Sequence, residues 1–149
     1  MLIKKIEEYY SKEHNLNCAE TILYAANDVY KLGLDKNALK MAAGFGGGMG
    51  IDSVCGALTG GIMVLGVLFV KDRAHESDKV KTLEKEFLNR YRDKMGDINC
   101  PQLKEKHHND EVRCLNVIKE AGIILDDIIK RELSCCKSKQ EPLSWIKAD

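Results

Sequence analysis

Residues 53–70 read SVCGALTGGIMVLGVLFV, a run without a single charged side chain. The run is only marginally long enough to span a bilayer, and its four glycines and two hydroxyl side chains suit a protein core better. We therefore predict a buried central helix that begins near Asp52 or Ser53 and continues past Phe69, rather than an integral membrane protein. Its small side chains sit at three-to-five-residue spacings that permit close helix packing: Gly56, Ala57, Gly60 and Gly61.

Apolar side chains elsewhere recur with the period of a helix, and no segment shows the sustained alternation of a strand. Asn17 and Glu20 match a capping box at a helix start, and Asp35 and Ser77 are further expected starts. The fold class is therefore predicted to be all-α, a single-domain bundle of about five to six helices around the glycine-containing central one. The other expected segments are 2–10, 17–33, 35–41, 77–96, a short helix opened by Cys100 and Pro101, and a long helix from Asn109 or Asp110 to Leu133.

The chain has 149 residues, no internal repeat and only two prolines, so residues 1–149 are predicted to form one domain with a polar tail at about 137–149. Trp145 in this tail is expected to dock on the bundle or on a partner subunit. The 23 basic and 23 acidic side chains cancel, which argues against nucleic acid or an anionic membrane as a partner. No export signal is recognisable at the start, so we predict a cytoplasmic protein.

Four of the six cysteines fall where helices are predicted to begin. Cys18 and Cys55 lie in the first turns of their helices. Cys100 precedes a proline that favours a helix start, and Cys114 lies about one turn into the last helix. Unpaired amides at helix starts lower the pKa of a thiol, so we predict one cluster of four thiolates if these starts meet in space. Inert core thiols stay open as an alternative, because cysteine is often simply buried and no C-x-x-C pair occurs.

Three other features are given lesser roles. Cys135 and Cys136 lie at the end of the last helix, where carbonyl groups disfavour a thiolate, and are treated as accessory. His107 and His108 are near enough to Cys100 in sequence to replace a cysteine as ligand, but their charged neighbours favour solvent exposure.

The run GFGGGMG at residues 44–50 lacks the full dinucleotide fingerprint and a Walker lysine. We expect its glycines to turn the chain tightly and to bring the backbone close to the cysteine site.

These features resemble the redox-active C-GCAxxG-C-C family. The resemblance rests on Cys18 followed by Ala19 and Glu20, the run GFGGGMG, the sequence CGALTG at residues 55–60, and isolated Cys100 and Cys114. It covers roughly residues 9–133 and maps the four cysteines of the family onto Cys18, Cys55, Cys100 and Cys114. The resemblance implies a helical, redox-linked protein. Relatives that join this domain to c-type haem sites further imply electron transfer and a bound iron–sulfur cluster, although this chain has no C-x-x-C-H for covalent haem.

Three chemistries follow for the site at Cys18, Cys55, Cys100 and Cys114. We favour an iron–sulfur cluster for electron transfer, binuclear (2Fe–2S) rather than tetranuclear (4Fe–4S), which serves an unidentified redox partner protein. The second is a thiol–disulfide enzyme or sensor without a metal, and the third is a structural zinc site. A symmetric homodimer is compatible with the small residues of the central helix.

Overall fold

A computed structural model describes residues 1–138, and this part of the chain is all-α, as predicted. It contains seven α-helices rather than five to six, and within it the only strand-like pairings are two isolated bridges. Short helical turns lie at Met41–Phe45, Gly48–Asp52 and Ala74–Glu76. The α-helices are α1 (Leu2–Tyr9), α2 (Cys18–Tyr30), α3 (Lys36–Lys40), α4 (Gly56–Phe69), α5 (Asp78–Met95), α6 (Cys100–His107) and α7 (Leu115–Ser138).

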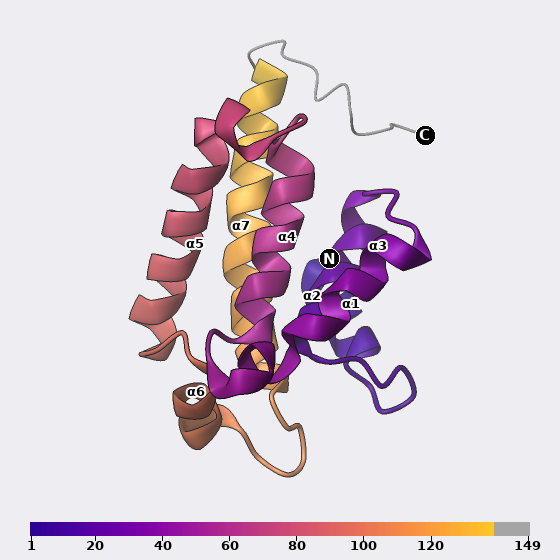
Figure 1. The fold of residues 1–149 in the computed structure, drawn as a ribbon, viewed down its shortest axis with the longest axis vertical. Helices are drawn as coiled ribbons and strands as arrows, with labels where there is room; N and C mark the ends of the chain where they lie inside the picture. Colours follow the sequence, from indigo (N-terminus) through magenta and orange to yellow (C-terminus); the bar gives the residue numbers. More distant parts are fainter. Residues whose placement is uncertain (139–149) are drawn as a thin grey trace.

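Helix α4 lies at the centre of the bundle, as the uncharged run predicts. Helices α4, α5 and α7 run side by side along the long axis, and α1, α2 and α3 form the other side of the molecule (Figure 1). Helix α6 and the turn at Gly48–Asp52 lie at the end of the bundle where α4 begins. Most of the α4 side chains are buried, so this helix links the two halves of the core.

The approach of α4 to α2 depends on glycine. A Cβ atom on Gly60 would lie 2.7 Å from the carbonyl oxygen of Ala19, which is closer than real Cβ atoms come to other atoms. A Cβ atom on Gly61 would lie 2.5 Å from the ring of Phe87 in α5. The small side chains of the central helix therefore allow its neighbours on both sides to pack closely.

Five of the predicted helix ends need correction. Helix α2 ends at a left-handed Lys31, with φ of 54°, rather than at Gly33. Helix α4 begins only at Gly56 and stops at Phe69. Helix α7 begins at Leu115, because Asn109 closes a turn of its own with Arg113, whose amide donates to the Asn109 carbonyl at 2.7 Å. It continues beyond Leu133 to Ser138, whereas Trp145 and the rest of the predicted tail from residue 139 lie outside the described residues.

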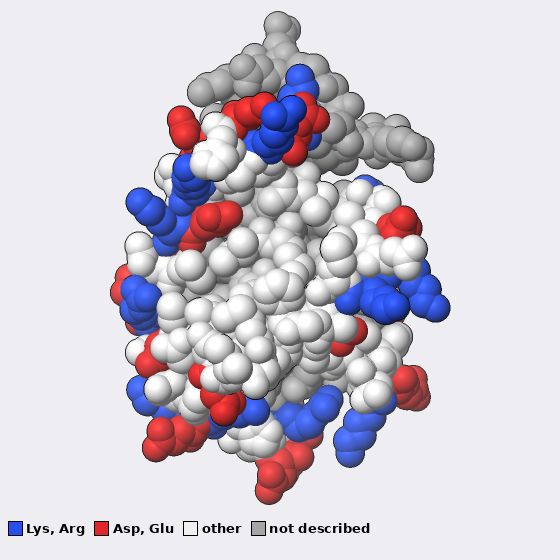
Figure 2. All heavy atoms as spheres, viewed as in Figure 1, with Lys and Arg blue, Asp and Glu red and all other residues white. Residues whose placement is uncertain are grey.

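The face of the molecule in Figure 2 carries its charged side chains mainly around the edge, and the surface across its middle is uncharged. Helix α4 and the turn before it lie on this side in Figure 1, which agrees with the lack of charge over residues 53–70. None of the helices in the described part has both the length and the apolarity needed to cross a bilayer.

Replacing Gly60 by alanine is expected to lower the free energy of unfolding by about 1–3 kcal/mol, because the added methyl group forces α4 away from the Ala19 backbone. Gly66→Ala in the same helix is the matched control, since a Cβ atom there meets nothing within 4 Å. Alanine should raise the stability at this position by up to about 1 kcal/mol through its helix preference. Urea denaturation followed by circular dichroism measures both changes, and equal midpoints for the two variants would contradict the packing argument.

Candidate functional site

The four cysteines that the sequence places at helix starts line one cavity of about 230 Å³. Cys18 is the first residue of α2, and Cys100 is the first residue of α6. Cys55 precedes α4 as its cap, and Cys114 immediately precedes α7 rather than lying one turn inside it. Cys55, Cys100 and Cys114 are buried, whereas Cys18 is half-buried. Four segments far apart in the chain thus bring their thiols to one place.

The starts of α4 and α6 are joined by backbone hydrogen bonds. The Cys55 amide donates to the carbonyl of Ile98 at 2.8 Å, and the Cys100 amide donates to the carbonyl of Ser53 at 2.8 Å. An antiparallel bridge between Val54 and Asn99 lies between these two bonds. The positions of Cys55 and Cys100 relative to each other are therefore fixed by main-chain atoms and do not depend on the thiols themselves.

The start of α2 is held by the predicted capping box. The Asn17 side chain accepts from the amides of Ala19 and Glu20 at 3.0 Å, and the Glu20 carboxylate accepts from the Asn17 amide at 2.9 Å. The side-chain NH₂ of Asn17 also donates to the carbonyl of Ala43 at 2.9 Å. A Cβ atom on Gly56 would lie 3.3 Å from the Cβ of Cys18, so α4 starts directly against the start of α2.

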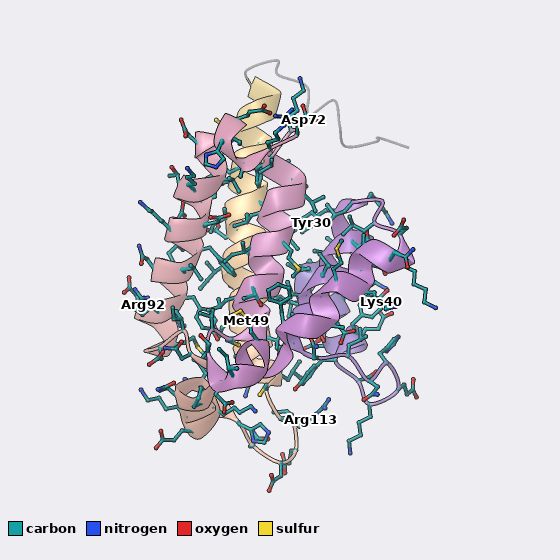
Figure 3. All side chains as sticks on the ribbon, viewed as in Figure 1. Tyr30, Lys40, Met49, Asp72, Arg92 and Arg113 are labelled. Carbon is teal, nitrogen blue, oxygen red and sulfur yellow. The ribbon has the colours of Figure 1, made fainter. Side chains whose placement is uncertain are left out.

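The glycine-rich run forms the turn beside the cavity, and Gly47 lines it. Gly47, Gly48 and Gly50 have φ between 61° and 71°, a left-handed conformation that glycine adopts without strain. Met49 shares this conformation, with φ of 61°. The expectation that the glycine run brings the backbone close to the cysteines is therefore confirmed at Gly47. Figure 3 shows Met49 and Arg113 toward the same end of the bundle as α6.

Three of the four thiols have a raised pKa, contrary to the prediction that helix starts would stabilise four thiolates. The pKa of Cys18 is raised by its hydrogen bond with Cys114 and by burial. Burial raises the pKa of Cys55 to about 11, although the amides of Ala57 and Leu58 donate to its sulfur. Burial also raises the pKa of Cys100. The cost of burying a charge therefore exceeds the help from helix-start amides at these three positions.

Cys114 is the exception, because its pKa is lowered to about 6. The largest cause is the hydrogen bond from the Cys18 thiol. The nearby basic side chains of His108 and Lys104 and a hydrogen bond from Tyr10 act in the same direction. Within the Cys18–Cys114 pair, the thiolate is therefore favoured on Cys114. A thiolate next to a thiol is the arrangement from which disulfide exchange begins.

Basic side chains also line the cavity, and sequence reasoning missed them. Lys104, His108 and Arg113 contribute to its wall, and no Asp or Glu does so among the lining residues described. The view of both histidines as merely solvent-exposed was wrong in part. His108 is exposed but lines the cavity, and His107 is half-buried with its Nε2 3.3 Å from the Met95 carbonyl oxygen. The only sequence signal that linked His107 and His108 to the site was their nearness to Cys100 and Cys114 in the chain.

Tyr10 is the other lining residue that the sequence did not reveal. It ends α1, and its hydroxyl accepts a hydrogen bond from the Cys114 amide at 3.2 Å. Because the two residues lie 104 positions apart, no local pattern connects them.

The four thiols line a space that is larger than a single ion. Within residues 1–138, no three His, Cys, Asp or Glu side chains converge as ligands of one metal ion. The cavity is several times larger than the ~30 Å³ that one water molecule occupies in the liquid. The arrangement offers four sulfur donors around a space, with positive charge at its wall.

In metal-free protein, Cys114 is expected to be the first of the four cavity thiols to react with iodoacetamide at pH 7. The thiolate is the reactive form, so the rate should fall as the pH drops through about 6. Cys18→Ala removes the largest cause of the lowered pKa and should move this midpoint upward, whereas Cys18→Ser retains a donor and should move it less. Peptide mass spectrometry after labelling at a series of pH values measures the midpoint, and an unchanged midpoint in C18A would refute the assignment.

Comparison with known proteins places these cysteines in a family. The family described as "Putative redox-active protein (C_GCAxxG_C_C)" matches residues 16–128, a range that includes Cys18, Cys55, Cys100 and Cys114. No curated protein and no solved structure matches the chain. Since the match covers most of the sequence and agrees with the resemblance seen in its motifs, the chain belongs to the C_GCAxxG_C_C family of redox-active proteins.

Proposed function

We propose that the protein carries single electrons on a binuclear iron–sulfur cluster held by Cys18, Cys55, Cys100 and Cys114. The observation that carries this proposal is that the four thiols line one cavity whose charged lining residues are all basic. Four cysteine thiolates are the usual ligands of 2Fe–2S and 4Fe–4S clusters. Such a centre is negatively charged overall, so Lys104, His108 and Arg113 would offset its charge.

The volume of the cavity that the four thiols line favours a cluster over a single zinc ion. A structural zinc site needs four ligands at ~2.0–2.3 Å from one point. A binuclear cluster takes two thiolates on each iron, so its four ligands surround a group of atoms rather than one ion. A cavity lined by thiols on several sides meets this requirement better.

The residues around the thiols also suit a redox centre. When bound, the cluster supplies reversible one-electron transfer. The amides of Ala57 and Leu58 donate to the sulfur of Cys55, and hydrogen bonds to sulfur are one of the means by which proteins adjust a cluster's reduction potential. An electron carrier also needs a redox partner protein, which the sequence does not identify. A cytoplasmic location and a homodimer stay predictions from the sequence.

Protein purified without oxygen, or reconstituted with iron and sulfide, is expected to be coloured and to contain about two irons and two acid-labile sulfides per chain. Single serine replacements of Cys18, Cys55, Cys100 and Cys114 should each lower the iron content. Cys135→Ser is the matched control, because Cys135 is exposed on α7 and does not line the cavity, and it should retain full iron content. A colourless wild-type protein after reconstitution would reject the proposal, and a zinc content of one per chain would favour a structural metal site.

A second candidate function is thiol–disulfide exchange by the Cys18–Cys114 pair, favoured by the hydrogen bond between their thiols and the low pKa of Cys114. The Cys114 thiolate would attack a substrate disulfide and release one thiol. Cys18 would then lose its proton and attack the Cys114 sulfur, which forms the internal disulfide and releases the second thiol. Two electrons would pass from the protein to the substrate, which takes up two protons.

Oxidised glutathione is a direct probe of this second function. It should convert metal-free protein to a form with a Cys18–Cys114 bridge, detected by mass spectrometry of unreduced peptides, and Cys55→Ser should leave the bridge intact. A bridge between other cysteines, or stable glutathione adducts without an internal bridge, would contradict this candidate.

A further inference from the structure

Tyr10 and Arg113 form a contact that joins the end of α1 to the start of α7. The Arg113 guanidinium carbon lies 4.4 Å from the centre of the Tyr10 ring, and Arg113 Nη2 donates to the Tyr10 carbonyl at 3.1 Å. Arg113 adopts φ of 52°, in the left-handed region that is uncommon for residues other than glycine. The turn that delivers Cys114 to the cavity is thus held against Tyr10 by a charge–ring contact and a hydrogen bond.

The Tyr10 hydroxyl contacts the next residue along the chain. Its oxygen accepts from the Cys114 amide at 3.2 Å, and only 9% of the Tyr10 surface is exposed. Because the oxygen is occupied as an acceptor, the hydroxyl proton is left to donate, and it forms the hydrogen bond with the Cys114 sulfur described above. A tyrosine hydroxyl has an ordinary pKa of about 10, so it keeps this proton at neutral pH. One hydroxyl therefore holds both the amide and the sulfur of the same cysteine.

We propose that Tyr10 is a positioning residue of the four-cysteine site, whose hydroxyl, held in place by Arg113, fixes Cys114 and adjusts the reduction potential of the centre that Cys114 binds. The part of this inference that concerns potential rests on the proposed iron–sulfur function. The part that concerns position does not, because the hydrogen bond from the Cys114 amide exists without a metal. A hydrogen bond donated to a ligand sulfur stabilises the reduced, more negative state and so raises the potential.

The neighbouring tyrosine supplies a matched control. Tyr9 lies one residue earlier in α1, and its hydroxyl donates to Asp28 at 2.8 Å rather than to a residue of the cavity. Tyr10→Phe and Tyr9→Phe each remove one hydroxyl and keep the ring. Tyr10→Phe also keeps the Arg113 contact, because that contact uses the ring and the main-chain carbonyl.

Hydrogen exchange of the Cys114 amide in metal-free protein tests the positioning role. Tyr10→Phe removes the acceptor of this amide, and its exchange should become about tenfold faster, the change expected for one lost hydrogen bond. Tyr9→Phe should leave the Cys114 rate unchanged. Arg113→Gln, which keeps the hydroxyl but removes its anchor, should also speed exchange at Cys114. Equal Cys114 rates in wild type and Y10F, with both proteins folded by circular dichroism, would overturn the inference.

Redox titration of the reconstituted proteins tests whether Tyr10 adjusts the reduction potential. The midpoint potential of Y10F should be more negative than that of wild type, equivalent to about a tenfold change in the equilibrium constant for reduction, and Y9F should match wild type. Equal potentials in all three proteins would overturn the role in tuning. If the wild type takes up no iron, the proposed cluster fails, while amide exchange at Cys114 still decides whether Tyr10 positions this cysteine.

Discussion

The four-cysteine cavity depends on how closely α4 approaches α2. Gly56 and Gly60 lie on the face of α4 that meets the start of α2, and a Cβ atom at either position would crowd the main chain of Ala19. This approach sets Cys55 beside Cys18. The backbone bonds from Cys55 to Ile98 and from Cys100 to Ser53 then add α6 to the same end of the bundle. The placement of the thiols thus follows from main-chain packing, so the cavity does not need a bound group to bring three of its four sulfurs together.

Burial and local charge, rather than helix starts alone, determine which thiol ionises. All four cysteines lie at helix starts, yet the pKa is lowered only at Cys114. Cys114 differs because it accepts hydrogen bonds from Cys18 and Tyr10 and faces His108 and Lys104. The helix-start effect is on the order of 1 kcal/mol, whereas removing a charge from water costs several kcal/mol. The hydrogen bond from Cys18, with help from the cavity wall, is therefore what favours a thiolate on Cys114.

Features that depend on local sequence were predictable, and those that depend on long-range contacts were not. The capping box at Asn17, the buried run after Cys55 and the glycine turn at residues 44–50 each follow from neighbouring residues, and the structure contains all three. The predicted start of α7 was wrong, because the amides of Glu111 and Val112 donate to the Asn109 side chain and form a separate turn. Tyr10 and Arg113 could not be assigned to the site, because their contacts join residues more than 100 positions apart. That the four helix starts share one cavity became visible only in three dimensions.

The wide separation of the cysteines has a consequence for how the protein matures. In metal modules built on C-x-x-C pairs, two neighbouring ligands can capture a metal before the rest of the chain has formed. Among the four cavity cysteines the closest pair in sequence is Cys100, the first residue of α6, and Cys114, which immediately precedes α7. The chain therefore offers no pair of neighbouring ligands that could capture a metal before its helices have packed together. A cofactor that binds all four cysteines would therefore enter after folding, and an assembly factor would have to recognise the folded protein rather than a short peptide.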